Sequence, residues 1–145
     1  MEVRRAKPSD ADAIAAVFIR SYESLTFLPR VRTHAERREY VRDVLLPQHE
    51  VWVAEEDGRV VGFASLLGSD LSQLYVDPDA QGRGVGGALL GKAQERRPDG
   101  LTFWVFQENE RARRFYEAHG CRVVRLTDGS GNEERTPDAL YEWRP

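Results

Sequence analysis

The 145-residue chain carries 21 Lys and Arg against 24 Asp and Glu, for a net charge of −3, and 41% of its residues are hydrophobic. These values favour one globular domain over 1–145 and argue against a nucleic acid partner, which calls for a basic surface. The lone Cys121, the lack of an apolar signal segment and the lack of an apolar run of membrane length predict a cytoplasmic protein that binds no membrane.

Four helices and seven strands are predicted in chain order. Helices are expected to begin at Pro8-Ser9-Asp10, at Thr33 (where Glu36 completes a capping box), within 82–87 and at Asn109. Strands are expected at 2–7, 51–54, 60–67, 71–76, 101–106, 121–126 and 140–143.

The connections between these elements predict how the strands pair. Asp57-Gly58 indicates a tight hairpin, so the strands at 51–54, 60–67 and 71–76 form an antiparallel meander. The helix after 71–76 makes a crossover, so the strand at 101–106 is expected to run parallel to 71–76. The fold class is therefore mixed α/β (α+β), in the order β-α-α-β-β-β-α-β-α-β-β, with a mostly antiparallel sheet of about seven strands flanked by four helices.

The stretch from Leu74 to Leu90 holds four glycines within six residues, between a short strand and a helix. A helix that begins in such a loop presents unpaired N–H groups and the positive end of its dipole. This arrangement predicts an anion site, and phosphate is the anion that such sites usually bind.

This loop fits neither of two common nucleotide-binding motifs well. Gly82-x-Gly84-x-x-Gly87, with Glu108 downstream, matches the dinucleotide fingerprint. However, Asp77 to Gln81 separate the strand from the first glycine, and fewer than about sixty residues follow for a doubly wound sheet. The triphosphate loop is excluded because no Gly-Lys-Ser/Thr follows the glycines.

The pattern Gln81-x-x-Gly84-x-Gly86, after a strand that ends Leu74-Tyr75-Val76-Asp77-Pro78, resembles the acetyl-CoA loop of the GNAT N-acetyltransferase superfamily. Asn109-x-x-Ala112-x-x-Phe115-Tyr116-Glu117-x-x-Gly120 is similar to a later motif of that family, and the order of elements is also the family's. The resemblance covers nearly the whole chain. It departs at Cys121, where the family commonly places Phe.

The resemblance implies a transferase that uses acetyl-CoA as co-substrate. The pyrophosphate suits the N–H groups of 82–87, and the pantetheine arm would lie in a gap where the strands at 71–76 and 101–106 splay apart. The N–H of Val76 would face the thioester carbonyl. The expected CoA-binding residues are Leu74, Tyr75, Val76, Gln81, Gly82, Arg83, Gly84, Val85, Gly86, Gly87, Asn109, Ala112 and Tyr116.

Asn109, Ala112 and Tyr116 lie on one stripe of the last helix. The resemblance implies that Asn109 binds the pantetheine and that the Tyr116 hydroxyl protonates the departing thiolate. A helix cap and a core aromatic are the simpler interpretations of these two residues. For Arg111 and Arg114 a solvated helix face is favoured over contact with the 3′-phosphate.

The acceptor is expected to be a primary amine that attacks the thioester directly, after a base removes its proton. Candidate bases are Asp70, Glu133 and Glu134, although a solvated surface charge explains each of them as well. The acceptor pocket is expected between 22–34 and the loop that holds the two glutamates. Arg30, Arg32 and Arg37 hint at an anionic part of the substrate, but a solvated helix face explains them as well. No metal site is expected, because His34, His49 and His119 lack ligand spacing.

Two other functions are compatible with these motifs. One is a CoA-binding regulatory module without turnover, and the other is a toxin-like acetyltransferase that acts on aminoacyl-tRNA, which the negative charge disfavours. The sequence leaves open whether the acceptor is a small molecule or a peptide, whether acyl groups other than acetyl are used, and whether the chain forms a homodimer.

Overall fold

The computed structural model describes residues 1–145. Its strands are β1 (Glu2–Arg5), β2 (Glu50–Glu56), β3 (Arg59–Leu67), β4 (Asp70–Val76), β5 (Leu101–Phe106), β6 (Arg122–Leu126) and β7 (Asp138–Trp143). They form one seven-stranded sheet in the order β1-β2-β3-β4-β5-β7-β6. Only β4 and β5 pair in parallel, and every other neighbouring pair is antiparallel. The predicted meander and crossover are confirmed, and the mostly antiparallel sheet excludes a doubly wound dinucleotide fold.

The helices follow the predicted order. They are α1 (Ala11–Glu23), α2 (His34–Tyr40), α3 (Leu46–Gln48), α4 (Val85–Arg96) and α5 (Glu110–Ala118), and a π-helical segment at Val41–Leu45 joins α2 to α3. The predicted second helix is thus this continuous segment from α2 to α3. Its capping box forms as expected, because Thr33 accepts from the Glu36 N–H at 3.1 Å and Glu36 accepts from the Thr33 N–H at 2.9 Å. None of the helices is both long and apolar enough to cross a membrane.

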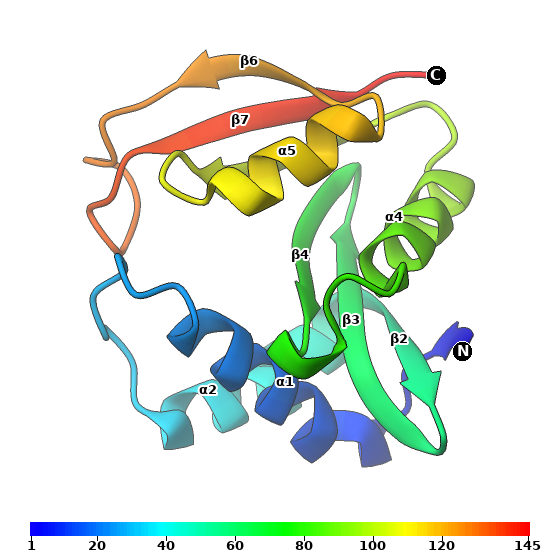
Figure 1. Cartoon of the computed structure of the whole chain (residues 1–145). Coiled ribbons are helices and arrows are strands. Elements are labelled where there is room, and N and C mark those ends of the chain that lie inside the picture. Colours follow the sequence, from blue (N-terminus) through cyan, green and yellow to red (C-terminus); the bar gives the residue numbers. More distant parts are fainter.

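The helices cover the sheet from both sides and enclose two hydrophobic clusters. α1 and the π-helical segment pack with Phe63 of β3 on one face, and α4 with Tyr116 of α5 packs with Leu66 of β3 on the other. Alternate side chains of a strand point to opposite faces, which is why one strand serves both clusters. Figure 1 shows α1 and α2 together at one end of the molecule, with α4 and α5 flanking the upper part of the sheet.

The sheet is interrupted between β4 and β5. Their parallel register holds only at Asp70 and Thr102, and in Figure 1 β4 runs steeply while β7 and β6 run almost horizontally. A β-bulge begins the divergence: Ser65 pairs with Gln73 and Leu66 with Leu71, so Ser72 is the extra residue. We call the unpaired space between Ser72–Val76 and Phe103–Phe106 the β4–β5 opening.

Candidate active site

The glycine loop turns the chain from β4 into α4. Gly82 and Gly84 have φ of 81° and 83°, a left-handed conformation that side chains resist. Gly84 caps α4, and Ala88 is the first residue to donate back into the helix, to the Gly84 carbonyl at 3.1 Å. The N–H groups of Val85, Gly86 and Gly87 therefore have no partner in the helix and point out of its positive end. This is the geometry of the predicted anion site.

Gly86 and Gly87 are sites where two helices pack closely. Both lie inside α4, where a Cβ on Gly86 would meet the Phe115 ring at 3.3 Å and a Cβ on Gly87 would meet His119 Nε2 at 3.3 Å. These two glycines let α5 pack closely on the start of α4. The packing fixes the distance between the loop and the helix that carries Tyr116.

A network of ionic and hydrogen bonds holds the turn before the loop. Arg20 of α1 donates to Asp77 at 2.9 Å and to Asp79 at 2.8 Å, and Asp77 also accepts from the Asp79 N–H at 2.9 Å. Burial alone would raise the pKa of Asp77, but these hydrogen bonds outweigh it and hold the pKa below its usual value. Gln81 donates to the Val76 carbonyl at 3.2 Å, and Arg83 pairs with Glu56 at 2.9 Å.

Backbone groups of β4 face the β4–β5 opening. Val76 lies opposite Gly62 in the register, and the next residue, Asp77, donates its N–H to the Val61 carbonyl at 2.8 Å. Because hydrogen bonding alternates along antiparallel strands, the N–H groups of Leu74 and Val76 point away from β3 and toward β5. The side chain of Tyr75 packs on the face covered by α1, whereas those of Leu74 and Val76 pack on the face covered by α4.

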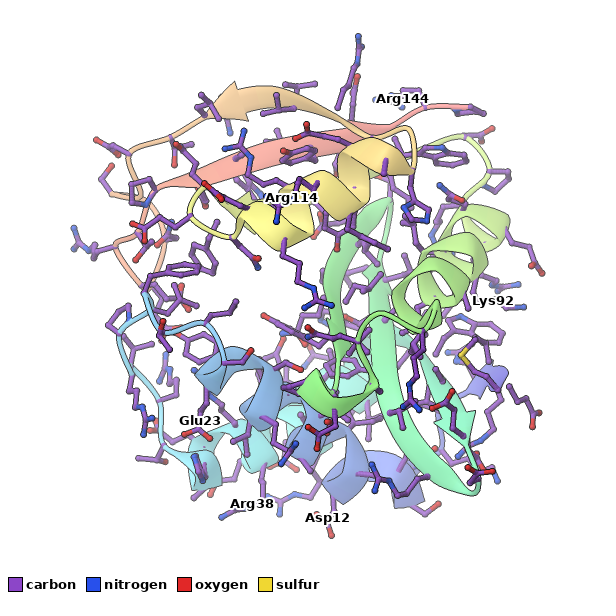
Figure 2. The ribbon with its side chains drawn as sticks, in the orientation of Figure 1. Asp12, Glu23, Arg38, Lys92, Arg114 and Arg144 are labelled. Carbon is purple, nitrogen blue, oxygen red and sulfur yellow. The ribbon has the colours of Figure 1, made fainter.

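The α5 stripe lies beside the opening. Asn109 caps the helix, since its Oδ1 accepts from the Ala112 N–H at 3.2 Å, and its Nδ2 makes no hydrogen bond. Tyr116 is 7% exposed, lies 4.4 Å from Phe103 of β5 between ring centroids and forms no hydrogen bond through its hydroxyl. Burial, together with the phenol of Tyr75 on β4, raises its pKa. Arg114, labelled on α5 in Figure 2, is exposed and lies 3.8 Å from Glu110, as expected of a solvated helix face.

A cavity of about 730 Å³ lies on the other side of the opening, between α1, the α2–π segment, β4, β5 and the loop before β7. We call it the α1–β4 cavity. The two segments expected to build the acceptor pocket meet at its wall, where Arg32 pairs with Glu133 at 2.5 Å and the Tyr22 hydroxyl lies 3.4 Å from Glu134. The structure thus brings Glu134, Tyr75 and the aromatic ring of Phe106 to one space.

The charged groups of the α1–β4 cavity are mostly acidic. Five carboxylates and two guanidinium groups line it: Glu36, Glu39, Asp43, Glu133, Glu134, Arg32 and Arg37. Arg32 is engaged by Glu133 and, at 3.4 Å, by Glu36, and Arg37 lies buried 3.9 Å from the centroid of the Tyr22 ring. Arg30 pairs with Glu23 at 3.4 Å. The three arginines therefore already have partners within the protein, so they do not indicate a substrate with an anionic part.

Asp70 lies apart from the other site residues. It is at the closed end of the opening, opposite Thr102, about 20 Å along β4 from Val76. It does not line the α1–β4 cavity. Burial raises the pKa of Asp70, and the nearby His49 opposes that shift.

Gln73 and Ser72 were missed by reasoning from the sequence. Both line the α1–β4 cavity, because the bulge places two successive side chains on one side of β4. Gln73 Oε1 is the one fully buried side-chain polar atom without a hydrogen-bond partner. Regular alternation of β4 would have put one of the two residues on the opposite face, so only a sign of the bulge could have revealed the pair.

Neither Cys121 nor a cluster of metal ligands adds a second reactive centre. Cys121 is buried, and burial raises the pKa of its thiol to about 11. No three His, Cys, Asp or Glu side chains lie together as potential metal ligands.

Comparison with known proteins identifies relatives of the whole chain. The model of the acetyltransferase (GNAT) domain matches residues 47–122. The peptidyl-lysine N-acetyltransferase YiaC of Escherichia coli K12 is 36% identical over 145 residues, which cover 97% of this chain and 95% of YiaC.

Solved structures share the fold. The solution structure of the apo form of YjaB from Escherichia coli superposes with a TM-score of 0.80 at 29% identity, covering 98% of this chain and 96% of that one. The PaiA N-acetyltransferase of Thermoplasma acidophilum, solved in complex with coenzyme A, has a TM-score of 0.74 at 16% identity and covers 99% and 98% of the two chains. The second likeness concerns the fold alone.

Proposed function

The chain belongs to the GNAT family of N-acetyltransferases, and we propose that it moves an acetyl group from acetyl-CoA to a lysine side chain of a peptide or protein by direct attack. The observation that carries this proposal is the β4–β5 opening, which lies between the glycine loop on one side and the acid-lined α1–β4 cavity on the other. A donor held in the opening and an amine held in the cavity meet without crossing the core. The proposal places the reaction in the cytoplasm.

Acetyl-CoA is the donor in this proposal. Its pyrophosphate lies on the N–H groups of Val85, Gly86 and Gly87, where the helix dipole adds favourable charge. Asn109 holds the arm through its Nδ2, which is free because the helix cap uses only its Oδ1. Because Oδ1 and Nδ2 have separate partners, the Asn109 side chain can cap α5 and bind the ligand at the same time.

Two backbone N–H groups of β4 bind the arm and polarise the thioester. The arm enters from the glycine loop, so it reaches Val76 first and Leu74 two residues deeper. Both N–H groups point into the opening, and one of them stabilises the developing oxyanion of the tetrahedral intermediate. The role expected for Val76 alone is therefore extended to this pair.

Tyr116 is the proposed general acid for the CoA thiolate. Its raised pKa keeps the phenol protonated, which an acid requires. The same burial raises the pKa of a neighbouring thiol, as at Cys121, where it reaches about 11. Burial therefore disfavours a free CoA thiolate in this environment and favours its protonation by a nearby donor.

The acceptor proposal rests on charge and on one unpartnered atom. The lining of the α1–β4 cavity carries five carboxylates against two guanidinium groups, and this net negative charge attracts a cation. Gln73 lines the same cavity, and its unpartnered Oε1 can accept from an ammonium N–H once the amide turns toward the cavity. Glu134, which lines the same cavity, is the proposed base, directly or through a water, for the proton that the attacking nitrogen loses as the amide forms. YiaC, the relative described above, is named a peptidyl-lysine N-acetyltransferase.

An acceptor screen tests this function. We expect CoA release from acetyl-CoA with a lysine-containing peptide, and mass spectrometry should place the added acetyl group on Nζ. A peptide of the same sequence with Lys replaced by norleucine and a free N-terminus separates lysine from N-terminal acetylation. Polyamines and free amino acids test the small-molecule alternatives. Tight acetyl-CoA binding without CoA release across this panel would support a regulatory module instead.

A further inference from the structure

His49 connects the α1–β4 cavity to the closed end of β4. It follows α3 at the start of β2, and its Nδ1 lies 2.9 Å from Ser72 Oγ. Ser72 lines the cavity because of the bulge. Its hydroxyl also lies 2.6 Å from Ser65 Oγ and 3.2 Å from the Ser65 carbonyl oxygen. A polar chain of side chains thus runs from the cavity wall to a half-buried imidazole.

We propose that Ser72 and His49 form a proton relay that removes the proton lost by the acceptor ammonium, with Asp70 stabilising the charged imidazole. The proposal rests on the function proposed above. Ser72 lines the acceptor cavity, His49 acts through Ser72, and Asp70 acts through His49. Asp70 therefore contributes as a positioning residue at the closed end of β4, although it does not reach the cavity itself.

The relay moves one proton and needs no other reactant. The N–H bond of the ammonium breaks as Ser72 Oγ takes that proton, and the hydroxyl proton of Ser72 passes to His49 Nδ1. The imidazolium then releases its Nε2 proton to water. Exchange with solvent returns the proton from Nδ1 to Nε2, which restores the acceptor lone pair that faces Ser72. For this transfer the Ser72 hydroxyl turns from the Ser65 carbonyl to His49 Nδ1, and Ser72 Oγ then accepts from the Ser65 hydroxyl.

The charges around His49 suit a group that gains and loses a proton in each cycle. Burial lowers the pKa of His49, and the carboxylate of Asp70 opposes this shift. The adjacent Glu50 is already bound by Arg96 at 2.6 Å and by Arg97 at 3.3 Å. Asp70 is therefore the charged group that acts on the imidazole.

A pH profile of turnover distinguishes a relay from a structural role. We expect His49→Gln and Ser72→Ala to lower kcat/KM for a lysine peptide about 100-fold at pH 7. The loss should shrink as the pH approaches about 10, because lysine then arrives already deprotonated. Ser72→Thr keeps the hydroxyl and should restore most of the activity, and His34→Gln, an exposed histidine outside the cavity, should match the wild type.

A loss of the same size at every pH, or no loss, would overturn the relay while leaving the transferase function intact. Absence of turnover by the wild type would instead contradict the proposed function. NMR titration of the His49 ring gives a readout independent of turnover: Asp70→Asn should lower its pKa, and an unchanged pKa would remove Asp70 from the relay.

Discussion

Asp70 of β4 and Thr102 of β5 are paired in parallel, and the Thr102 N–H donates to the carbonyl of Ser69 at 3.1 Å. From this pair the two strands diverge, and the bulge at Ser72 sets the direction in which β4 leaves. The N–H groups of Leu74 and Val76, which β4 would otherwise share with β5, are left free for a ligand. The position of one strand pair thereby sets how deep the β4–β5 opening extends.

Tyr116→Phe should lower kcat about 100-fold or more, because it removes the proposed proton donor. The fold should be little affected, since the hydroxyl makes no hydrogen bond and the ring keeps its contact with Phe103. CoA release measures the first effect, and thermal melting with and without CoA measures the second. Full activity in a folded variant would assign the acid role to another group.

Gly86→Ala should lower the melting temperature and weaken acetyl-CoA binding, because its Cβ would press on the Phe115 ring at 3.3 Å. Gly91→Ala in the same helix is the matched control. Nothing lies within 4 Å of its Cβ, so the higher helix propensity of Ala should stabilise the protein by about 1 kcal/mol. Calorimetry of both variants checks the prediction, and equal effects would mean that α5 does not limit the size of residue 86.

Glu50 should contribute to the loss of folding stability at acidic pH. Burial alone would raise its pKa, but hydrogen bonds from Arg96, Trp52 and Arg97 lower it from the ordinary 4.5 to about 2. Since the folded-state pKa is depressed, the stabilisation is present above about pH 4.5 and is lost as the pH falls toward 2. Because the Glu50 side chain is only 15% exposed, solvent screens its ion pairs little, and its contribution to the free energy of unfolding is on the order of 3 kcal/mol.

Urea unfolding between pH 7 and pH 2.5 tests this contribution. The stability of Glu50→Gln should fall less with acidification than that of the wild type, and the two curves should converge at the acidic end. Glu95→Gln, an exposed residue of α4, should follow the wild type. Parallel curves for wild type and Glu50→Gln would show that this carboxyl has the same pKa in both states.

Gln73→Met should separate stability from activity. It removes the buried, unpartnered Oε1 while keeping the length of the side chain, so the free energy of unfolding should rise by about 1 kcal/mol. The same change should raise KM for a lysine peptide and leave KM for acetyl-CoA unaltered. If the variant were less stable than the wild type, Gln73 would have a partner that the structure does not contain.

Local sequence signals predicted the helices, strands and turns well. Thr33 with Glu36, Asp57-Gly58 and Asn109 each act within a few residues, so their hydrogen bonds or turn geometry can be inferred from spacing. The parallel placement of β5 followed from the crossover rule and is confirmed. The identity of the family was also predicted from two motifs and is confirmed by the matching domain model.

The acceptor side depended on contacts that spacing does not encode. The bulge at Ser72 arises from pairing with β3, so the sequence alone gave no reason to place Gln73 and Ser72 in one cavity. Arg32 is engaged by Glu133, about a hundred residues further along the chain, and its partner could not be assigned in advance. β7 also begins earlier than expected, at Asp138, because that residue pairs with Phe106 across the sheet.

The two hydrophobic clusters, one on each face of the sheet, have a consequence for how this enzyme can diversify. Residues that shape the α1–β4 cavity rest on the cluster of α1 and Phe63, whereas the glycine loop and α5 rest on the other cluster. If the amine binds in this cavity as proposed, substitutions on the first face alter which amine enters while the sheet shields the opposite face from repacking. Acceptor preference can therefore drift among descendants of such a chain while the donor stays the same.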